Sequence, residues 1–274
     1  MIESRYLVVD GVRTHYLEGG TGRTIVLLHS GEFGAAAEIS WEFNLAALAE
    51  HFHVVAPDWL GFGRTDKIRD FVDGRARLQA HLSRFLALMG IDEADFIGNS
   101  MAGGMIMRAA SSNPPLLRIR RIVLASGGGF SPANEARAAL HGYDCTVGGM
   151  QRILAALFHD PKWPADEAYV QRRFAMSTMP GAWECTASAR FGSPIRPPRL
   201  VHGQSDVIEY EKVPFPTLII AGENDKLRLP GYGEEIARRT PDAQLLVFDK
   251  CGHCPNIEQA DRFNEAVIAF LAGN

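Results

Sequence analysis

Short runs of consecutive apolar residues alternate, in the first half of the chain, with longer segments whose apolar residues recur every three or four positions. The run TIVLLHS (24–30) is continuous and β-branched, which predicts a strand buried on both faces, and ADFIGNS (94–100) predicts another. Between them, RLQAHLSRFLALMG (77–90) has helical spacing and stops at a glycine. This alternation favours a mostly parallel sheet with helices on both faces, preceded by a hairpin around Asp10 and Gly11.

The alternation is interrupted in the middle of the chain and resumes near its end. The resumed part holds two predicted strands, TLIIAGEN (217–224) and QLLVFDK (244–250), and a closing amphipathic helix. The interrupted part is mainly helical in its apolar spacing. We therefore predict a core formed by residues 1–129 and 213–274, with a helical lobe, residues 130–212, inserted into it.

The composition is that of an ordinary soluble enzyme. Of 274 residues, 46% are apolar and 22% charged, and the net charge of −4 does not suit binding to nucleic acid or to an anionic membrane. No run approaches the roughly 18 apolar residues of a membrane helix, and the start MIESRYLVVDG lacks the features of a signal peptide. The four cysteines are too few for a disulfide scaffold, so reduced thiols in the cytoplasm are expected.

The segment FIGNSMAGG (96–104) carries the strongest chemical signal, because it follows a predicted strand and opens a predicted helix. This is the context of a nucleophile elbow, G-x-S-x-G, in which a tight turn exposes a serine and requires small residues two positions before and after it. Ser100 would be the nucleophile, flanked by Gly98 and by Ala102, where the strict pattern has glycine. The alternative is a serine that only caps a helix.

A second segment, LLHSGEFG (27–34), follows a predicted strand with a flexible loop whose amides can face the serine. The N–H groups of Gly31 and of Met101, the residue after the serine, would form an oxyanion hole for a tetrahedral intermediate. We interpret His29 in this loop as structural rather than as a base.

The other two members of a catalytic triad follow the last two predicted strands. Asp225 stands just past one strand end, where open α/β sheets place their site residues, although Glu223 competes for this role. His253 lies in the loop after the last predicted strand. The order Ser100, Asp225, His253 is that of the α/β hydrolases, with the histidine as general base and the aspartate orienting it. This chemistry requires no metal and no organic cofactor.

His253 also lies inside Cys251-Gly-His-Cys254, which has the C-x-x-C spacing of dithiol redox enzymes. Such a motif belongs near a βαβ unit, with most of the domain still to follow. Here only twenty residues follow Cys254, and Pro255 comes directly after it. The histidine, rather than the two thiols, is therefore predicted to be functional.

Together these residues resemble the α/β-hydrolase superfamily over essentially the whole chain. Within it, the segments GNSMAGG (98–104), VVAPDWLGFGRTDK (54–67) and KCGHCPNIEQADRFNEAVIAFL (250–271) are similar to the meta-cleavage product hydrolases, which cut a C–C bond in vinylogous 1,5-diketones from aromatic-ring degradation. The resemblance implies an α/β-hydrolase fold, a mostly parallel eight-stranded sheet flanked by helices with an inserted helical lid. It also implies a homodimer or larger homo-oligomer that acts on a small molecule.

The resemblance further implies which residues meet the substrate. Arg173 corresponds to a lid arginine that contacts the dienoate end, with the adjacent Arg172 as its rival, and Asn99 corresponds to a position that lines the site. Cys254 stands where the family commonly has tryptophan, and Glu32 lies in a loop that is commonly glycine-rich. A carboxylate near an anionic substrate at low dielectric is unfavourable unless Glu32 points outward.

The same triad also fits other activities. The first alternative is a carboxylic ester or lactone hydrolase acting on a small aromatic-pathway compound, because the triad and oxyanion hole serve ordinary acyl transfer equally well. A more distant alternative is a ligand-binding module that retains the triad.

Overall fold

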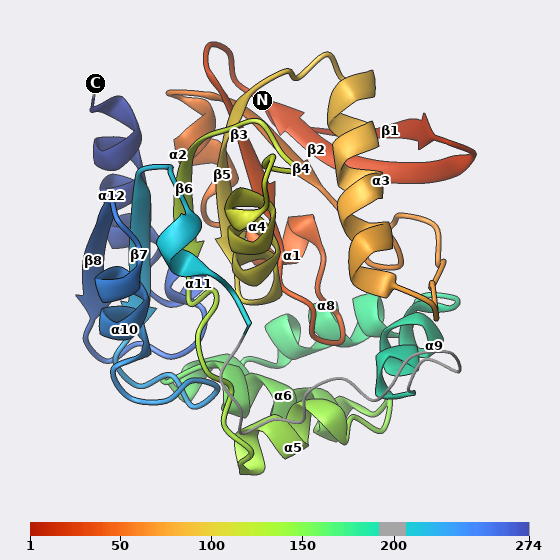
Figure 1. Ribbon diagram of the computed structural model, residues 1–274. Coiled ribbons are helices and arrows are strands. Elements are labelled where there is room, and N and C mark those ends of the chain that lie inside the picture. Colours follow the sequence, from red (N-terminus) through yellow and green to blue (C-terminus); the bar gives the residue numbers. More distant parts are fainter. Residues whose placement is uncertain (192–206, 274) are drawn as a thin grey trace.

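The described residues, 1–191 and 207–273 of this computed structural model, are built around a single sheet of eight strands (Figure 1). The strands lie in the order β1-β2-β4-β3-β5-β6-β7-β8; those from β4 to β8 are parallel, and β2 is antiparallel to both of its neighbours. The predicted fold class, a mostly parallel sheet flanked by helices, is confirmed. The strands are β1 Glu3–Val9, β2 Val12–Gly19, β3 Thr24–Leu28, β4 His53–Pro57, β5 Ala94–Asn99, β6 Ile119–Ala125, β7 Thr217–Gly222 and β8 Ala243–Phe248.

The antiparallel edge of the sheet begins with the predicted hairpin. Asp10 and Gly11 connect β1 to β2 and adopt positive φ angles of 49° and 83°, which suit a two-residue turn that follows the twist of the flanking strands. Val9 and Val12 pair on either side of this turn. The local sequence is therefore enough to place this hairpin.

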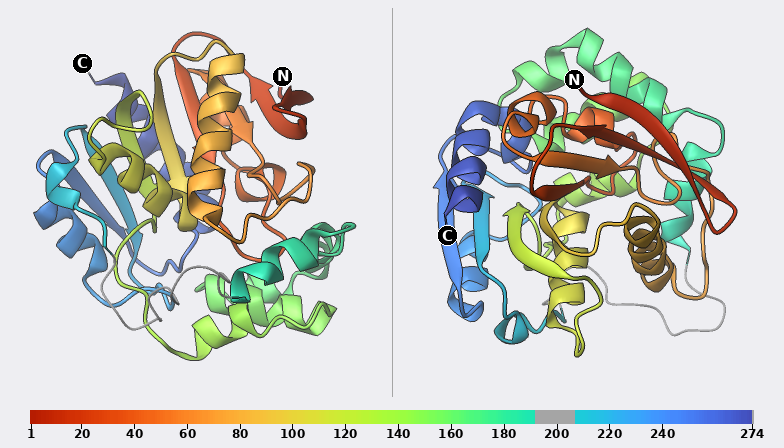
Figure 2. Two further views of the ribbon diagram at one scale, coloured as in Figure 1. Left: turned by 45° about the vertical axis from the view of Figure 1, so that its right-hand side comes forward. Right: turned by 90° about the horizontal axis from the view of Figure 1, so that it is seen from above.

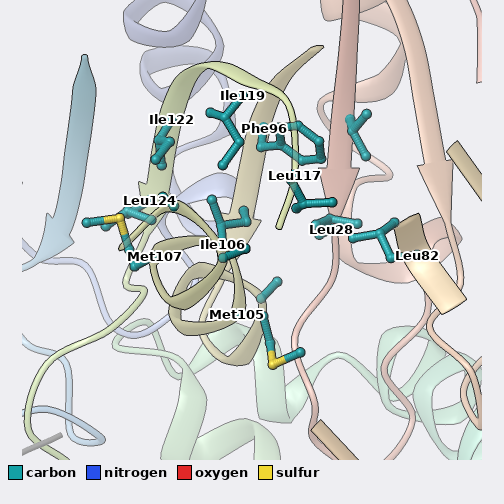
Figure 3. Packing of buried hydrophobic residues seen from close by; sticks show 14 of the residues in the cluster. Leu28, Leu82, Phe96, Met105, Ile106, Met107, Leu117, Ile119, Ile122 and Leu124 are labelled. Atoms are coloured by element: carbon teal, nitrogen blue, oxygen red, sulfur yellow. The ribbon is translucent and has the colours of Figure 1, made fainter. Parts of the chain in front are cut away.

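Helices cover both faces of the sheet (Figure 2). A hydrophobic core lies on each side of the sheet. Neighbouring strand residues serve opposite cores, so that in β5 the side chain of Phe96 packs on one face and that of Ile97 on the other. Ile106, from the helix directly after β5, fills the first core beside Phe96 (Figure 3). The first face carries α3 (Gly74–Leu88), α4 (Met101–Ser111) and α10 (Tyr232–Arg239); the second carries α2 (Leu45–Ala49) and α12 (Ala260–Ala272).

Between β6 and β7 the chain leaves the sheet and forms helices beyond the carboxyl ends of the parallel strands (Figure 1). These helices pack in a third hydrophobic cluster, which includes Met150, Leu154 and Tyr169 and also Phe33 and Cys254 from the loops after β3 and β8. The helices are α5 Glu135–His141, α6 Val147–Leu157, α7 Lys162–Ala165, α8 Glu167–Ser177 and α9 Ala182–Ala187. The predicted lobe, residues 130–212, contains them together with residues 192–206, which lie outside the described residues, so its separation from the core stays a prediction.

Two further short helices, α1 (Ala37–Ser40) and α11 (Pro255–Glu258), lie in the loops after β3 and β8. Both loops carry predicted site residues. In the part of the chain that the structure describes, no helix has both the length and the apolarity needed to span a bilayer.

Candidate active site

Ser100 lies in the sharp turn between β5 and α4. Its φ of 55° and ψ of −110° are values that residues other than glycine rarely adopt, and such strain is typical of functional turns. Small neighbours make the turn possible, because a Cβ on Gly98 would lie 2.8 Å from the Gly103 nitrogen and one on Gly103 would lie 2.6 Å from Gly127 Cα. Ala102, where the strict pattern has glycine, is fully buried and its methyl group packs in the core.

The structure brings Ser100, His253 and Asp225 together from the loops after three different strands. His253 Nε2 lies 2.7 Å from Ser100 Oγ, and His253 Nδ1 lies 2.7 Å from Asp225 Oδ2. Because the carboxylate accepts a hydrogen bond from Nδ1–H, Nε2 is left as the acceptor that faces the serine hydroxyl. Asp225 also accepts the N–H of Leu227 at 2.8 Å, whereas the competing Glu223 is exposed.

The loop that carries His253 is held in place by hydrogen bonds from two neighbouring elements. The His253 N–H donates to the Leu157 carbonyl of α6 at 2.7 Å, and Asn99 Nδ2 donates to the His253 carbonyl at 3.3 Å. Asn99 is 1% exposed and also donates to the Ala125 carbonyl. The structure thus shows Asn99 holding the His253 loop, and Asn99 is not among the described residues that line the cavity. A contact between Asn99 and the substrate stays a prediction.

Burial and the interaction between His253 and Asp225 together determine the charge state of the triad. Burial lowers the pKa of His253, and the nearby carboxylate of Asp225 opposes that shift only in part. Burial acts to raise the pKa of Asp225, but the charge and the hydrogen bond of His253 outweigh it, so this pKa stays below its ordinary value. At neutral pH the pair is therefore a neutral imidazole beside a carboxylate, which is the state that a general base requires.

Gly31 and Met101, the predicted oxyanion-hole residues, both line the cavity in front of the triad. Met101 is the first residue of α4, so its N–H has no acceptor within the helix. A Cβ on Gly31 would lie 2.5 Å from Met101 Sδ, which shows how closely the two loops approach. His29 is buried and accepts the Trp59 N–H at 3.0 Å, a placement that fits a structural role.

Arg173 lies behind the cavity wall rather than on its surface. Its guanidinium pairs with Glu32 at 2.6 Å and donates to the Tyr169 hydroxyl, and Arg173 is 0% exposed. Burial acts to raise the pKa of Glu32, but the charge of Arg173 outweighs it and keeps that pKa below its ordinary value. The Glu32 side chain is therefore buried in the protein rather than turned out to solvent, and Arg173 neutralises its charge. The rival Arg172 is exposed and pairs with Glu42.

The two cysteines that flank the histidine are both buried. Cys254 is 1% exposed and packs in the hydrophobic cluster of α6–α8. Burial raises the pKa of Cys254 and also that of Cys251, so a reactive thiolate is disfavoured at both positions. Cys254 is not among the described residues that line the cavity, because its side chain faces the helices instead.

The cavity in front of the triad has two chambers, which meet at Ser100. The first, of about 330 Å³, contains His253 and Gly31 and is called the triad chamber below. The second, of about 440 Å³, lies along α4 and is called the α4 chamber. Both are lined by Arg75, Ser100, Met101, Ser131, Ala189 and Arg228.

Sequence reasoning missed three of the polar residues in these walls. Arg137 lines the triad chamber, and Ser131 and Arg228 line both chambers. None of them belongs to a recognisable motif, and the only available signal was the position of Arg228 three residues after Asp225. Within residues 1–191 and 207–273, no group of three or more His, Cys, Asp or Glu side chains is arranged to hold a metal ion.

A model of the alpha/beta hydrolase family matches residues 25–266, from β3 into α12. The chain belongs to this family. As an alpha/beta hydrolase it carries the serine, aspartate and histidine in the order Ser100, Asp225, His253, and the hydrogen bonds described above connect them.

Comparison with individual proteins shows which members of this family the chain is similar to. This hydrolase is 33% identical to the 2-hydroxymuconate semialdehyde hydrolase of Pseudomonas sp. CF600, over 98% of this chain and 93% of that protein. It is 30% identical to the 2-hydroxy-6-oxo-2,4-heptadienoate hydrolase of Pseudomonas putida F1, over 98% and 96%. A solved meta-cleavage product hydrolase from Pseudomonas fluorescens IP01 has a TM-score of 0.87 at 28% identity, over 98% of this chain and 97% of that chain. The resemblance read from the three motifs is confirmed.

Proposed function

We propose that this hydrolase cleaves a C–C bond in a meta-cleavage product, a vinylogous 1,5-diketone of aromatic-compound degradation, with Ser100, His253 and Asp225 as its triad. The proposal rests on the continuous hydrogen-bond chain from Asp225 through His253 to Ser100 Oγ, which opens onto the triad chamber. The similar hydrolases of 2-hydroxymuconate semialdehyde and of 2-hydroxy-6-oxo-2,4-heptadienoate support this choice of bond.

In the proposed reaction, His253 first assists ketonisation of the bound dienolate. It then takes the proton of Ser100 Oγ, which attacks the keto carbon, while the N–H groups of Gly31 and Met101 stabilise the charge that develops on the carbonyl oxygen. Cleavage of the C–C bond releases a dienolate, which takes the proton back from His253 and leaves as 2-hydroxypenta-2,4-dienoate or a relative. Water then hydrolyses the acyl-serine to a carboxylic acid.

Replacement of the nucleophile and of the base tests this function. Ser100→Ala and His253→Ala should each lower turnover of a yellow ring-cleavage dienoate by about 10⁴–10⁶, because each removes a group on which the others depend. Turnover is followed as loss of the dienoate absorbance. The matched control is Ser111→Ala, at the far end of the same helix, which should keep the parent rate. A near-normal rate in either triad variant would contradict the mechanism.

The placement of Arg173 favours a second candidate function, hydrolysis of a carboxylic ester or lactone. The arginine expected to hold the dienoate end is neutralised by Glu32, while the triad and the oxyanion donors suit ordinary acyl transfer equally well. A side-by-side assay on a ring-cleavage dienoate and a p-nitrophenyl ester separates the two. We expect the larger kcat/KM on the dienoate, and the reverse ranking would establish the ester hydrolase.

We also propose that residues 130–212 act as a lid and that the enzyme is a homodimer or larger homo-oligomer in the cytoplasm. The lid role is supported by α6, since Leu157 both holds the His253 loop and lines the triad chamber. Light scattering coupled to gel filtration measures the oligomeric state, and a monomer at assay concentrations would contradict that part of the proposal.

A further inference from the structure

Arginine side chains surround the cavity although the chain as a whole has a net charge of −4. Arg75 and Arg228 line both chambers, and other arginines line only one of them: Arg137 in the triad chamber, Arg69 and Arg108 in the α4 chamber. The only carboxylate among the described residues of these walls is that of Glu32, and it is already paired with an arginine behind the wall. The cavity therefore carries an excess of positive charge next to the nucleophile.

Two of these arginines meet at one point of the wall. Nη2 of Arg137 and Nη1 of Arg228 both donate to Ser131 Oγ, at 3.3 Å and 3.2 Å. The same two atoms both donate to the Leu227 carbonyl, at 2.9 Å and 3.3 Å. Sharing two acceptors brings like charges close together, and neither guanidinium forms an ion pair with a carboxylate of the described residues.

Neither guanidinium is fully satisfied by its neighbours. The Nε atoms of Arg137 and of Arg228 are enclosed and have no hydrogen-bond partner within the described part of the chain. Burial and then the charge of Arg228 lower the pKa of Arg137 to about 10. Two partly desolvated cations that lie close together without a paired carboxylate gain most from an anion that neutralises both, and a carboxylate forms strong charge-assisted hydrogen bonds with a guanidinium.

We propose that Arg137, Arg228 and Ser131 form a carboxylate-binding subsite, which holds an acid group of the substrate while its carbonyl lies at Ser100. The inference takes its substrate from the proposed function and adds where the anion binds. This subsite would bind the carboxylate that the resemblance assigned to Arg173, because Glu32 neutralises the charge of Arg173. Arg137 comes from α5 and Arg228 from the loop after β7, so a bound carboxylate would also bridge the helical layer to the sheet.

Benzoate serves as the probe, measured as a competitive inhibitor of p-nitrophenyl acetate hydrolysis. Arg137→Gln should raise the inhibition constant of benzoate by about 10- to 100-fold, the effect of a lost charge-assisted hydrogen bond. The same substitution should change kcat/KM for the neutral ester at least tenfold less. Arg137→Lys, which keeps the charge, should recover part of the affinity. The matched control is Arg152→Gln, which changes an exposed arginine of α6 that pairs with Asp144, and it should leave the inhibition constant unchanged.

Two outcomes would overturn the subsite. In one, Arg137→Gln leaves the affinity for benzoate unchanged; in the other, it reduces neutral ester turnover and benzoate affinity by the same factor, as expected if the arginines only support the triad. Calorimetric titration of benzoate into Ser100→Ala, with and without Arg137→Gln, measures the subsite without catalysis. If the parent enzyme binds benzoate but hydrolyses neither the dienoate nor the ester, the proposed function is refuted while the subsite remains supported.

Discussion

Glu32 and Arg173 form an ion pair whose side chains are 3% and 1% exposed, with Glu32 in the wall of the triad chamber and Arg173 behind it. Two charges in such a place are stable only together, because each has lost its hydration and is compensated by the other. The Tyr169 hydroxyl supplies a further acceptor for the guanidinium. The pair therefore stabilises the loop after β3 against α8, and Arg173 has no free charge to offer to a substrate.

Removing the carboxylate should therefore be strongly destabilising. Glu32→Ala should lower the free energy of unfolding by about 3–5 kcal/mol, because it leaves Arg173 buried without a counter-charge. The control Glu38→Ala breaks the pair with Arg64, in which the side chains are 28% and 46% exposed, and should change stability by no more than about 1 kcal/mol. Chemical denaturation measures both. Equal small effects would show that the buried pair contributes no more than the exposed one.

The charge state of His253 predicts the acid side of the pH profile. A base acts only while it is neutral, and burial holds the pKa of His253 below its ordinary 6.5. Thus the acid-side decline of kcat/KM should have its midpoint below pH 6.5. Asp225→Asn should move this decline to still lower pH, because it removes the charge that opposes burial, and should lower turnover by about 10⁴. A decline centred above pH 6.5 would contradict the burial argument.

At the scale of elements, α4 is positioned by contacts that leave no room for larger residues. The helix passes so close to the residues after β6 that Gly103 and Gly127 meet backbone to backbone. One residue further along, a Cβ on Gly104 would meet nothing nearer than Ile208 Cδ1 at 3.9 Å. The two adjacent glycines thus have different physical roles, although the sequence pattern treats them alike.

These adjacent glycines form a matched pair of variants. Gly103→Ala should lower the free energy of unfolding by about 1–3 kcal/mol, because its Cβ would lie 2.6 Å from Gly127 Cα. Gly104→Ala should leave stability unchanged or raise it by up to about 1 kcal/mol, since alanine favours a helix over glycine. Thermal unfolding distinguishes them, and equal responses would mean that the elbow tolerates movement of α4.

At the scale of the whole molecule, charge is distributed unevenly. The net charge is −4, yet arginines line both chambers of the cavity. A cavity with low-dielectric walls focuses the field of such charges and raises the local concentration of an anionic substrate. Added salt shortens the range of this attraction, to about 8 Å at physiological ionic strength.

The uneven charge predicts a selective effect of salt. The KM of an anionic dienoate should rise several-fold between about 10 mM and 500 mM sodium chloride, because screening weakens its attraction to the cavity. The KM of p-nitrophenyl acetate, which is neutral, should stay constant over the same range and serves as the internal control. Steady-state kinetics measure both. An equal rise for the two substrates would indicate a general effect of salt on the enzyme.

The sequence by itself determined the features that depend on neighbouring positions. Apolar spacing predicted the alternation of strands and helices, the small residues around Ser100 predicted the elbow, and the order of Ser100, Asp225 and His253 predicted a triad that the structure brings together. These signals are readable because each arises within a few residues of one strand end. The lengths of individual helices could not be read in this way, because they depend on tertiary packing; α2, for example, contains only Leu45–Ala49.

Only the tertiary structure decided which charges meet. Glu32 and Arg173 are 141 positions apart, and Arg137 bonds to a carbonyl 90 positions away, so no local pattern links them. The resemblance could assign Arg173 to the substrate, but it could not show that Glu32 neutralises this arginine. The physical reason is that electrostatic compensation depends on distance and burial in space, whereas motifs report only distance along the chain. The triad could therefore be recognised in the sequence, and the charge that surrounds it could be recognised only in the fold.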